Sequence, residues 1–397
     1  MSSSSPDIDT APRQLLRMTL SLFLSYLAVA MALPVSSVYV ARELGLGNVL
    51  GGLAVGIAFL STILTRRYAG GIADRLGGKL CMRRGLLLYA AASLICLAAG
   101  WRMPSAPASY AILIAGRLLL GLGESLALVG VIGWGIGLMG PARSGRVMAL
   151  VGMGMYGAFA AGGPLGLALF HRLGFAGLMA VCAVLPLAGL LLVQGLPAVA
   201  PHPGQRAPFW QVMRRIWREG AVVCLQGVGF AALGAFISLL FISRGWPYSG
   251  FGLSCFGAGF VLMRLLCGHL PDRLGGTPVA IGSLAIEACG QYLLWLAPGP
   301  GLALLGALLT GLGCSMVFPA MGVDVVRRVP PQQRGTAVGG FAAFQDLAYG
   351  GTGPIAGLVA DHYGYGGIFL VGGMAATLGL ALAALGLRRP RAPAAAG

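Results

Sequence analysis

The sequence predicts an all-α membrane protein of twelve transmembrane helices, arranged as two pseudo-symmetric six-helix bundles with both termini in the cytoplasm. Three observations support this fold class. Only 10% of the 397 residues are charged, against about 25% in soluble domains. Apolar runs of membrane-spanning length recur along the whole chain. Short motifs also repeat at a spacing of about half the chain. So few charges exclude an ordinary cytosolic enzyme, and the high apolar content excludes a disordered chain.

Each apolar run is predicted to be a helix, because an isolated span must satisfy its own backbone hydrogen bonds. The first six runs occupy residues 15–40, 48–67, 84–101, 109–139, 145–170 and 174–196. The last six occupy residues 220–243, 249–267, 278–296, 301–323, 335–360 and 365–387. The first run resembles a signal peptide, but eleven further spans follow, so we expect it to be retained as the first helix.

A polar break divides the chain into residues 1–196, a linker at 197–219 and residues 220–397. Several prolines make the start of the linker irregular, and residues 209–218 read as an amphipathic helix on the inner leaflet. Most of the 27 basic residues fall on one side of the predicted spans. The positive-inside rule then places both termini in the cytoplasm. We expect a multi-pass protein of a bacterial inner membrane.

The formal net charge of +16 does not indicate nucleic-acid binding, because no basic stripe alternates with exposed aromatic residues. The eight cysteines lie singly, without a C-x-x-C pair, so no metal site, disulfide framework or cofactor is predicted. A G-x-G-x-x-G pattern at 152–157 lies inside an apolar span without a preceding strand. The chain also has no complete phosphate-binding loop, so energy must come from an ion gradient or a partner.

The two halves of the sequence share three separate motifs. Segment 70–79 matches segment 268–277 at an offset of 198 residues. Segment 121–125 matches 311–315 at an offset of 190, and the same offset relates the Gly-Pro pair at 163 to that at 353. Duplication of a six-helix unit explains all three matches, and paired repeats are the plan of many secondary transporters.

These motifs resemble those of the Major Facilitator Superfamily, and the resemblance covers nearly the whole chain. The family's loop motif, G-x-L-a-D-r-x-G-r-k, stands at residues 70–79, with Gly78 in place of a basic residue. Its fourth-helix motif, R-x-x-x-G-x-G, stands at 117–123. The resemblance implies alternating access, with helices 1, 4, 7 and 10 lining the cavity and helices 2, 5, 8 and 11 forming the moving interface.

Two further segments resemble narrower branches of that superfamily. The fifth-helix motif of drug:proton antiporters, G-P-x-x-G-G, is partly present. Gly163 and Pro164 match it, whereas Leu167 and Ala168 replace its last two glycines. Segment 323–335 resembles bacterial arabinose-efflux-like permeases.

Charged residues in the middle of a span are the candidates for coupling proton movement to transport. A charge in hydrocarbon costs at least about 2.5–3.5 kcal/mol, so each one needs a reason to be there. Glu124 is the midpoint of the fourth span, and Arg117 lies seven residues earlier on the same helix face. Their repeat equivalents are Ala307 and Cys314, so helix packing alone does not require charge there. We expect Glu124 to carry a proton or bind a substrate cation, and Arg117 to tune its proton affinity. A static buried ion pair is the alternative.

Asp346, beside Gln345 in the eleventh span, is a second candidate for proton or substrate binding, and Tyr156 is its repeat equivalent. A helix–helix hydrogen bond explains it equally well. Glu287 lies mid-span in the ninth helix, which is peripheral in the resembled architecture, so a structural hydrogen bond is favoured there. The possible cavity or support residues are Gln345, Glu287, Gln291 and Gln226.

The paired loop motifs predict a cytoplasmic gate. The resemblance implies that Asp74 latches near Arg334 at the start of the eleventh helix. By the repeat, Asp272 latches near Arg143 and Arg146 at the start of the fifth helix. Breaking these contacts would shift the population inward; the alternative is that basic loops serve orientation only. The gating set is Asp74, Arg75, Asp272, Arg273, Arg143, Arg146 and Arg334.

Two Gly-Pro pairs are candidate hinges: Gly163 with Pro164, and Gly353 with Pro354. They predict either a pivot or a close helix contact in the fifth and eleventh spans.

The sequence thus predicts a monomeric secondary transporter that exports a small amphipathic molecule in exchange for protons across a lipid bilayer. The alternative is proton-coupled or passive uptake of a sugar or small organic acid. A non-transporting receptor or a permease subunit is a third possibility, which the paired gating acids disfavour.

Overall fold

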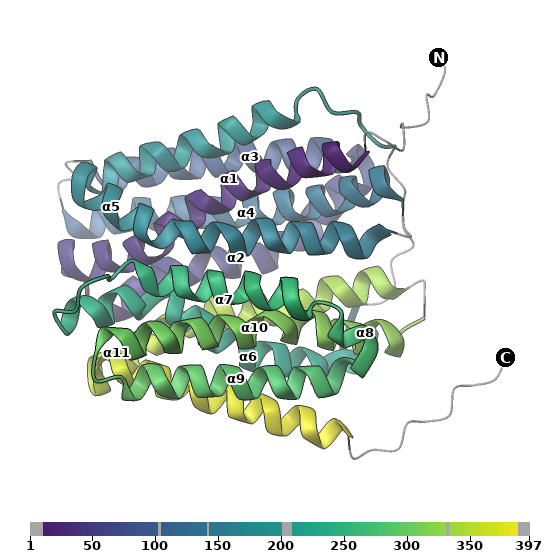
Figure 1. Cartoon of the computed structure of the whole chain (residues 1–397). Coiled ribbons are helices and arrows are strands. Elements are labelled where there is room, and N and C mark those ends of the chain that lie inside the picture. The colour runs from purple at the N-terminus through teal and green to yellow at the C-terminus, as the bar shows by residue number, and fades with distance from the viewer. Residues whose placement is uncertain (1–10, 102–104, 141–142, 201–208, 331–332, 388–397) are drawn as a thin grey trace.

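The computed structural model describes residues 11–101, 105–140, 143–200, 209–330 and 333–387, and all regular structure in these ranges is helical (Figure 1). The first half contains α1 (Ala11–Val38), η1 (Tyr39–Glu43), α2 (Gly47–Leu76), α3 (Gly78–Ala99), α4 (Ala106–Met139) and α5 (Ser144–Val193). The second half contains α6 (Phe209–Ser243), α7 (Phe251–Cys267), α8 (Leu270–Leu274), α9 (Gly276–Leu296), α10 (Pro300–Arg328) and α11 (Arg334–Leu387). The predicted all-α class is confirmed.

Helices α5 and α11 each correspond to two of the predicted spans. They contain 50 and 54 residues, far more than the roughly 20 that cross a bilayer. Each is interrupted by one glycine outside the helical region, Gly174 at φ 68° and Gly364 at φ 73°. Nine helices in the described ranges are long and apolar enough to cross a membrane, and α7 is a shorter apolar helix. The count of twelve crossings and the side of the termini stay predictions.

The backbone repeats at the offsets found in the sequence. Gly77 ends α2 at φ 86° and ψ 157°, and Gly275 ends α8 at φ 88° and ψ 160°. These two glycines lie 198 residues apart, as do the loop motifs that contain them. Gly174 and Gly364 lie 190 residues apart and share a second left-handed conformation, which favours glycine. The duplicated six-helix unit is therefore visible in the fold.

The predicted amphipathic segment forms one continuous helix with the seventh span. Helix α6 begins at Phe209 and ends at Ser243. Val212 and Ile216 on its first turns are buried in an apolar cluster of the second half, whereas Trp210 and Trp217 are exposed. The segment therefore packs on the second half through one face and presents tryptophan on another. The predicted linker residues 201–208 lie outside the described ranges.

The two halves touch closely at the end of the molecule where α2 and α7 begin, which we call the closed end (left in Figure 1). A Cβ atom added at Gly52 would lie 2.0 Å from the carbonyl oxygen of Gly353. A Cβ atom at Gly163 would lie 2.4 Å from the carbonyl oxygen of Gly250. Both predicted hinge pairs therefore form backbone contacts between the halves. The described dihedral angles of α5 and α11 leave the helical region only at Gly174 and Gly364, so neither proline interrupts its helix.

Candidate functional site

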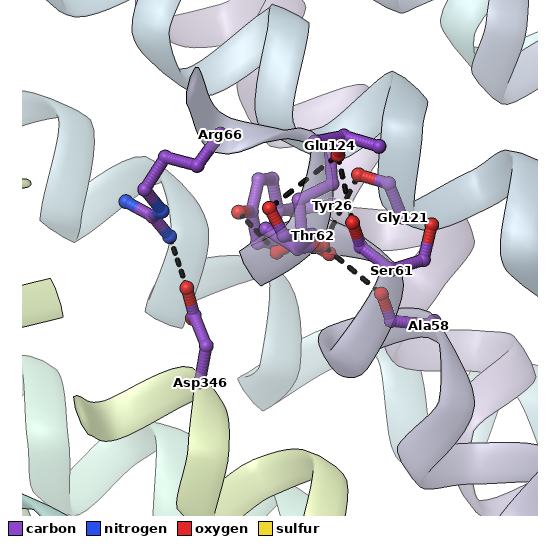
Figure 2. A network of polar contacts seen from close by, with 9 residues as sticks. Tyr26, Ala58, Ser61, Thr62, Arg66, Gly121, Glu124 and Asp346 are labelled. Atoms are coloured by element: carbon purple, nitrogen blue, oxygen red, sulfur yellow. Dashed lines mark hydrogen bonds and ion pairs between the residues drawn. The ribbon is translucent and has the colours of Figure 1, made fainter. Parts of the chain in front are cut away.

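Glu124 is a buried carboxyl group that a neutral side chain binds. It lies on α4 with 7% of its surface exposed, and Tyr26 of α1 is 2% exposed. The phenol of Tyr26 donates a hydrogen bond of 2.8 Å to Oε1 of Glu124 (Figure 2). In the described part of the chain no basic side chain forms an ion pair with Glu124. The carboxyl therefore has a partner that tolerates both its protonated and its ionised form.

Helix α2 supplies the polar wall beside this carboxyl (Figure 2). The hydroxyl of Ser61 donates to the carbonyl of Leu118 at 2.7 Å, and that of Thr62 donates to the carbonyl of Gly121 at 3.1 Å. A Cβ atom at Gly121 would lie 2.1 Å from the carbonyl oxygen of Ala58, so only glycine permits this approach of α2 to α4. These glycine and hydroxyl contacts fix α2 one turn from Glu124.

Arg117 binds the backbone of α2 and not Glu124. Its Nε donates to the carbonyl of Ala54 at 2.8 Å, and Nη2 donates to that of Val55 at 3.2 Å. The side chain is 2% exposed and borders a cavity of about 20 Å³ that Ser36 also lines. The static ion pair with Glu124 is therefore not formed in this conformation. Arg117 still acts electrostatically on Glu124, and its tuning role stays a prediction.

Asp346 pairs with Arg66 across the two halves (Figure 2). Arg66 lies on α2 and Asp346 on α11, and their side chains are 18% and 13% exposed. Both charges act electrostatically on Glu124. Sequence reasoning did not single out Arg66 and so missed this pair. Its position near the end of the predicted span 48–67 was the available signal.

The amide and acid candidates of the second half cluster within its interior. Gln345 of α11 donates to Gln226 of α6 at 3.4 Å. Gln291 of α9 donates to the carbonyl of Gly229 at 3.2 Å and to Thr310 at 3.3 Å. Glu287 is completely buried, and its carboxyl lies beside the thiol of Cys314 on α10 and the amide of Gln226 on α6. The structural role expected for Glu287 stays a prediction.

An aromatic cluster between the halves was missed by sequence reasoning. Tyr156 of α5 stacks on Phe260 of α7 with ring centroids 3.5 Å apart. Its hydroxyl lies 3.5 Å from that of Tyr349 on α11, whose ring contacts Phe230 of α6 at 4.8 Å. These rings come from four helices and are dispersed in sequence, so no local pattern marks them. They close the space between the halves beside the polar site.

The predicted gating residues lie at the end opposite the closed end. Asp74 is partly buried, and Arg75 is exposed. Asp272, Arg273, Arg143 and Arg146 are exposed. Among described side chains no ion pair joins Asp272 to Arg143 or Arg146. The side chain of Arg334 lies outside the described part of the structure. The gate therefore stays a prediction, to be tested in the conformation that closes this end.

Comparisons with known proteins agree with this architecture. The family model of the Major Facilitator Superfamily matches residues 18–270 and 220–397. An uncharacterized MFS-type transporter of Salmonella typhimurium is 44% identical over 375 residues, which are 94% of this chain and 97% of the relative. An uncharacterized MFS-type transporter of Burkholderia mallei is 38% identical over 389 residues, covering 96% of each chain.

Two solved structures share the fold. The D-xylose–proton symporter has a TM-score of 0.78 at 17% identity, over 95% of this chain and 97% of its own. The nucleoside transporter NupG, solved as a point mutant, has a TM-score of 0.76 at 15% identity, over 95% of this chain and 100% of its own. With its helical fold, the family match and the bacterial relatives identify this chain as a member of the Major Facilitator Superfamily, a multi-pass membrane transporter and not an enzyme.

Proposed function

We propose that the chain is a secondary active transporter of a bacterial inner membrane that exports a small amphipathic molecule in exchange for protons. One chain would complete the cycle by alternating access. The observation that carries the proposal is the Tyr26–Glu124 contact, in which a neutral phenol binds a buried carboxyl group. Because no basic side chain in the described structure pairs directly with Glu124, it would take up a proton in one conformation and lose it in the other.

The surroundings of Glu124 connect its proton to the movement of the halves. Arg66 lies one turn beyond Thr62 on α2, and Thr62 binds α4 three residues before Glu124. In this conformation Arg66 pairs with Asp346 on the opposite half. When α2 separates from α11, Arg66 loses that partner, and an ionised Glu124, on which its charge already acts, becomes an alternative on its own half. Deprotonation of Glu124 and separation of the halves would therefore favour each other.

The character of the interior favours an amphipathic cargo. Aromatic rings line the contact between the halves, and the chain contains a single asparagine, Asn48. The partial antiporter motif at Gly163 and Pro164 favours export. The amide pair Gln226–Gln345 supports the alternative, proton-coupled or passive uptake of a sugar or small organic acid, because amides are suited to binding hydroxyl and carboxylate groups.

The test is transport into everted membrane vesicles under an imposed pH gradient, acidic inside, with ethidium as a fluorescent amphipathic probe. Wild-type vesicles should accumulate ethidium, and Glu124→Gln should reduce accumulation to that of vesicles without the protein. Glu43→Gln is the matched control, because Glu43 is an exposed carboxyl in η1. Full pH-driven accumulation by a folded Glu124→Gln variant would contradict the proposal. Uptake of D-xylose into right-side-out vesicles, without ethidium export, would establish the alternative.

A further inference from the structure

Glu287 is the centre of a buried polar stripe in the second half. Ser283, Glu287 and Gln291 are spaced by four residues on α9, so they share one face of the helix. Their side chains are at most 2% exposed. In the described structure the hydroxyl oxygen of Ser283 and the amide oxygen of Gln291 lack hydrogen-bond partners. Buried polar atoms are normally paired, so a completely buried acid between two unpaired oxygens requires an explanation.

The protein surroundings of Glu287 contain no counter-charge. Helices α6, α8, α10 and α11 pack against α9. From these helices, the polar groups that act on the carboxyl are the thiol of Cys314 on α10 and the amide of Gln226 on α6. No charged side chain in the described structure does so. Burying a carboxylate without a paired charge is costly, and a protonated carboxyl avoids that cost. The surroundings of Glu287 are therefore suited to binding a proton in this conformation.

The repeat aligns Glu287 with a residue that packs against the helix of Glu124. A Cβ atom at Gly123 on α4 would lie 3.1 Å from the backbone nitrogen of Tyr89 on α3. A Cβ atom at Gly313 on α10 would lie 2.4 Å from the backbone nitrogen of Glu287 on α9. Glu287 is thus the counterpart of Tyr89.

In the two equivalent helix pairs, α3 with α4 and α9 with α10, the acid comes from a different helix. Glu124 follows Gly123 on α4, and Cys314 follows Gly313 on α10. Both Glu124 and Tyr89 are buried in the first half, as Cys314 and Glu287 are in the second. At this level each half therefore keeps a buried acid between the paired helices, contributed by α4 in the first half and by α9 in the second.

A chain of amides leads from Glu287 toward the contact between the halves. Gln226 lies beside Glu287 and is 1% exposed. It accepts a hydrogen bond from Gln345, which is partly exposed. Gln345 precedes Asp346, whose carboxylate binds Arg66 of the first half. When α2 separates from α11, the outer end of this amide chain becomes accessible to water.

We propose that Glu287 is a second proton-binding site, which exchanges its proton with water when the halves separate. In the exchange the O–H bond of the acid breaks, water takes the proton as hydronium, and the carboxylate keeps the electron pair. The N–H groups of Gln226 and Gln291 and the S–H group of Cys314 supply donors for the carboxylate. Its use in transport rests on the proposed proton coupling, whereas proton binding at Glu287 can be measured alone.

The experiment is infrared difference spectroscopy of the full chain in liposomes, recorded between acidic and alkaline buffer. The C=O stretch of one protonated carboxyl should disappear at alkaline pH in wild type. That band should be missing in Glu287→Gln and retained in both Glu43→Gln and Glu124→Gln. Loss of a second band in Glu124→Gln reports on the proposed function separately, so the two proposals can fail independently.

Three results would overturn the proposal. The first is a Glu287→Gln difference spectrum identical to that of wild type. The second is a Glu287 band that shifts when sodium replaces choline at constant ionic strength, which would make this a sodium site. The third needs no variant of Glu287 and so survives misfolding of Glu287→Gln. Gln226→Leu interrupts the amide chain and should slow hydrogen–deuterium exchange of the carboxyl; unchanged exchange would exclude the route.

Discussion

The contact between α2 and α11 and the contact between α5 and α7 are related by the internal repeat, but their chemistry differs. Arg66 and Asp346 form an ion pair in the first. At the equivalent positions of the second, Arg264 lies over the ring of Phe260 at 5.3 Å, and Tyr156 stacks on that same ring. The arginine is present in both contacts, whereas the carboxylate is replaced by a phenol in one.

This difference distinguishes the features that both repeats share from the charged residues found in only one of them. Both contacts keep glycines that allow backbone approach at the closed end. Arg264 donates to the carbonyl of Ser315 within its own half, so it contributes no charge pair between the halves. The α2–α11 contact can therefore respond to protonation of nearby acids. The α5–α7 contact is made largely by aromatic rings and should respond less.

The largest effect is expected where backbone meets backbone at the closed end. In Gly52→Ala the new Cβ would lie 2.0 Å from the carbonyl oxygen of Gly353 inside α11, an atom that cannot move without the helix. The variant should force the closed end open. A cysteine introduced at buried Ser37, in a background without native cysteines, should change from unreactive to reactive toward an impermeant maleimide added from that side.

Two further variants make this result specific. Gly351→Ala on the same helix adds a Cβ with no neighbour within 4 Å and should leave labelling unchanged. Gly163→Ala meets Gly250, which precedes α7 and is not part of a helix, so labelling should rise less than in Gly52→Ala. Equal labelling in Gly52→Ala and Gly351→Ala would contradict the assignment of the closed end.

The second effect compares the equivalent residues Asp346 and Tyr156. Asp346→Asn leaves Arg66 in a largely buried position without its carboxylate, which should cost roughly 3 kcal/mol of stability. Tyr156→Phe keeps the ring stacking and loses only a weak hydroxyl contact, which should cost less than about 1 kcal/mol. Thermal denaturation of the purified proteins in detergent measures both.

A double variant isolates the ion pair from other consequences of changing Asp346. Removing both charges, in Arg66→Gln with Asp346→Asn, should recover part of the stability that Asp346→Asn loses, because no unpaired charge remains. Additive losses in the double variant would show that the pair contributes no coupling. Equal losses in Asp346→Asn and Tyr156→Phe would remove the proposed difference between the two contacts.

The fold was predictable because membrane spans leave a strong local signal. Apolar runs give the helices, and the Gly-Pro and Asp-Arg motifs give the repeat before any contact is known. The turns at Gly174 and Gly364 follow the gaps between the predicted spans. The continuity of α6 was not predictable, because the polar residues of its first turns resemble those of a separate surface helix.

The candidate site was predictable only in part. Glu124 and Asp346 were found because an acid inside a span is costly. Their pairings were not found, since Tyr26 is 98 residues from Glu124 and Arg66 is 280 residues from Asp346. Such pairings depend on how each helix is rotated and how the helices cross. A span that is apolar on nearly every face does not show which of its faces meets which neighbour. Arg117 was expected on the face of Glu124, but its hydrogen-bond partners are backbone carbonyls, which every residue has.

The smallest effect is expected at the exposed rim of the α2–α11 contact. Asn48 donates a hydrogen bond of 2.7 Å to Asp361 at the closed end, and Tyr365 donates to Asn48 at 2.8 Å. Because this contact is exposed to solvent, Asp361→Ala should cost only about 0.5 kcal/mol.

The control for Asp361→Ala comes from the other contact. His171, the repeat equivalent of Asp361, is exposed on α5, and His171→Ala should leave the denaturation temperature unchanged. If Asp361→Ala destabilised the protein as much as Asp346→Asn, the α2–α11 contact would depend on its rim and not on its buried ion pair. A small loss of stability in Asp361→Ala together with a large loss in Asp346→Asn would instead show that the buried Arg66–Asp346 ion pair stabilises this contact. That ion pair acts electrostatically on Glu124, so protonation of Glu124 can affect the contact.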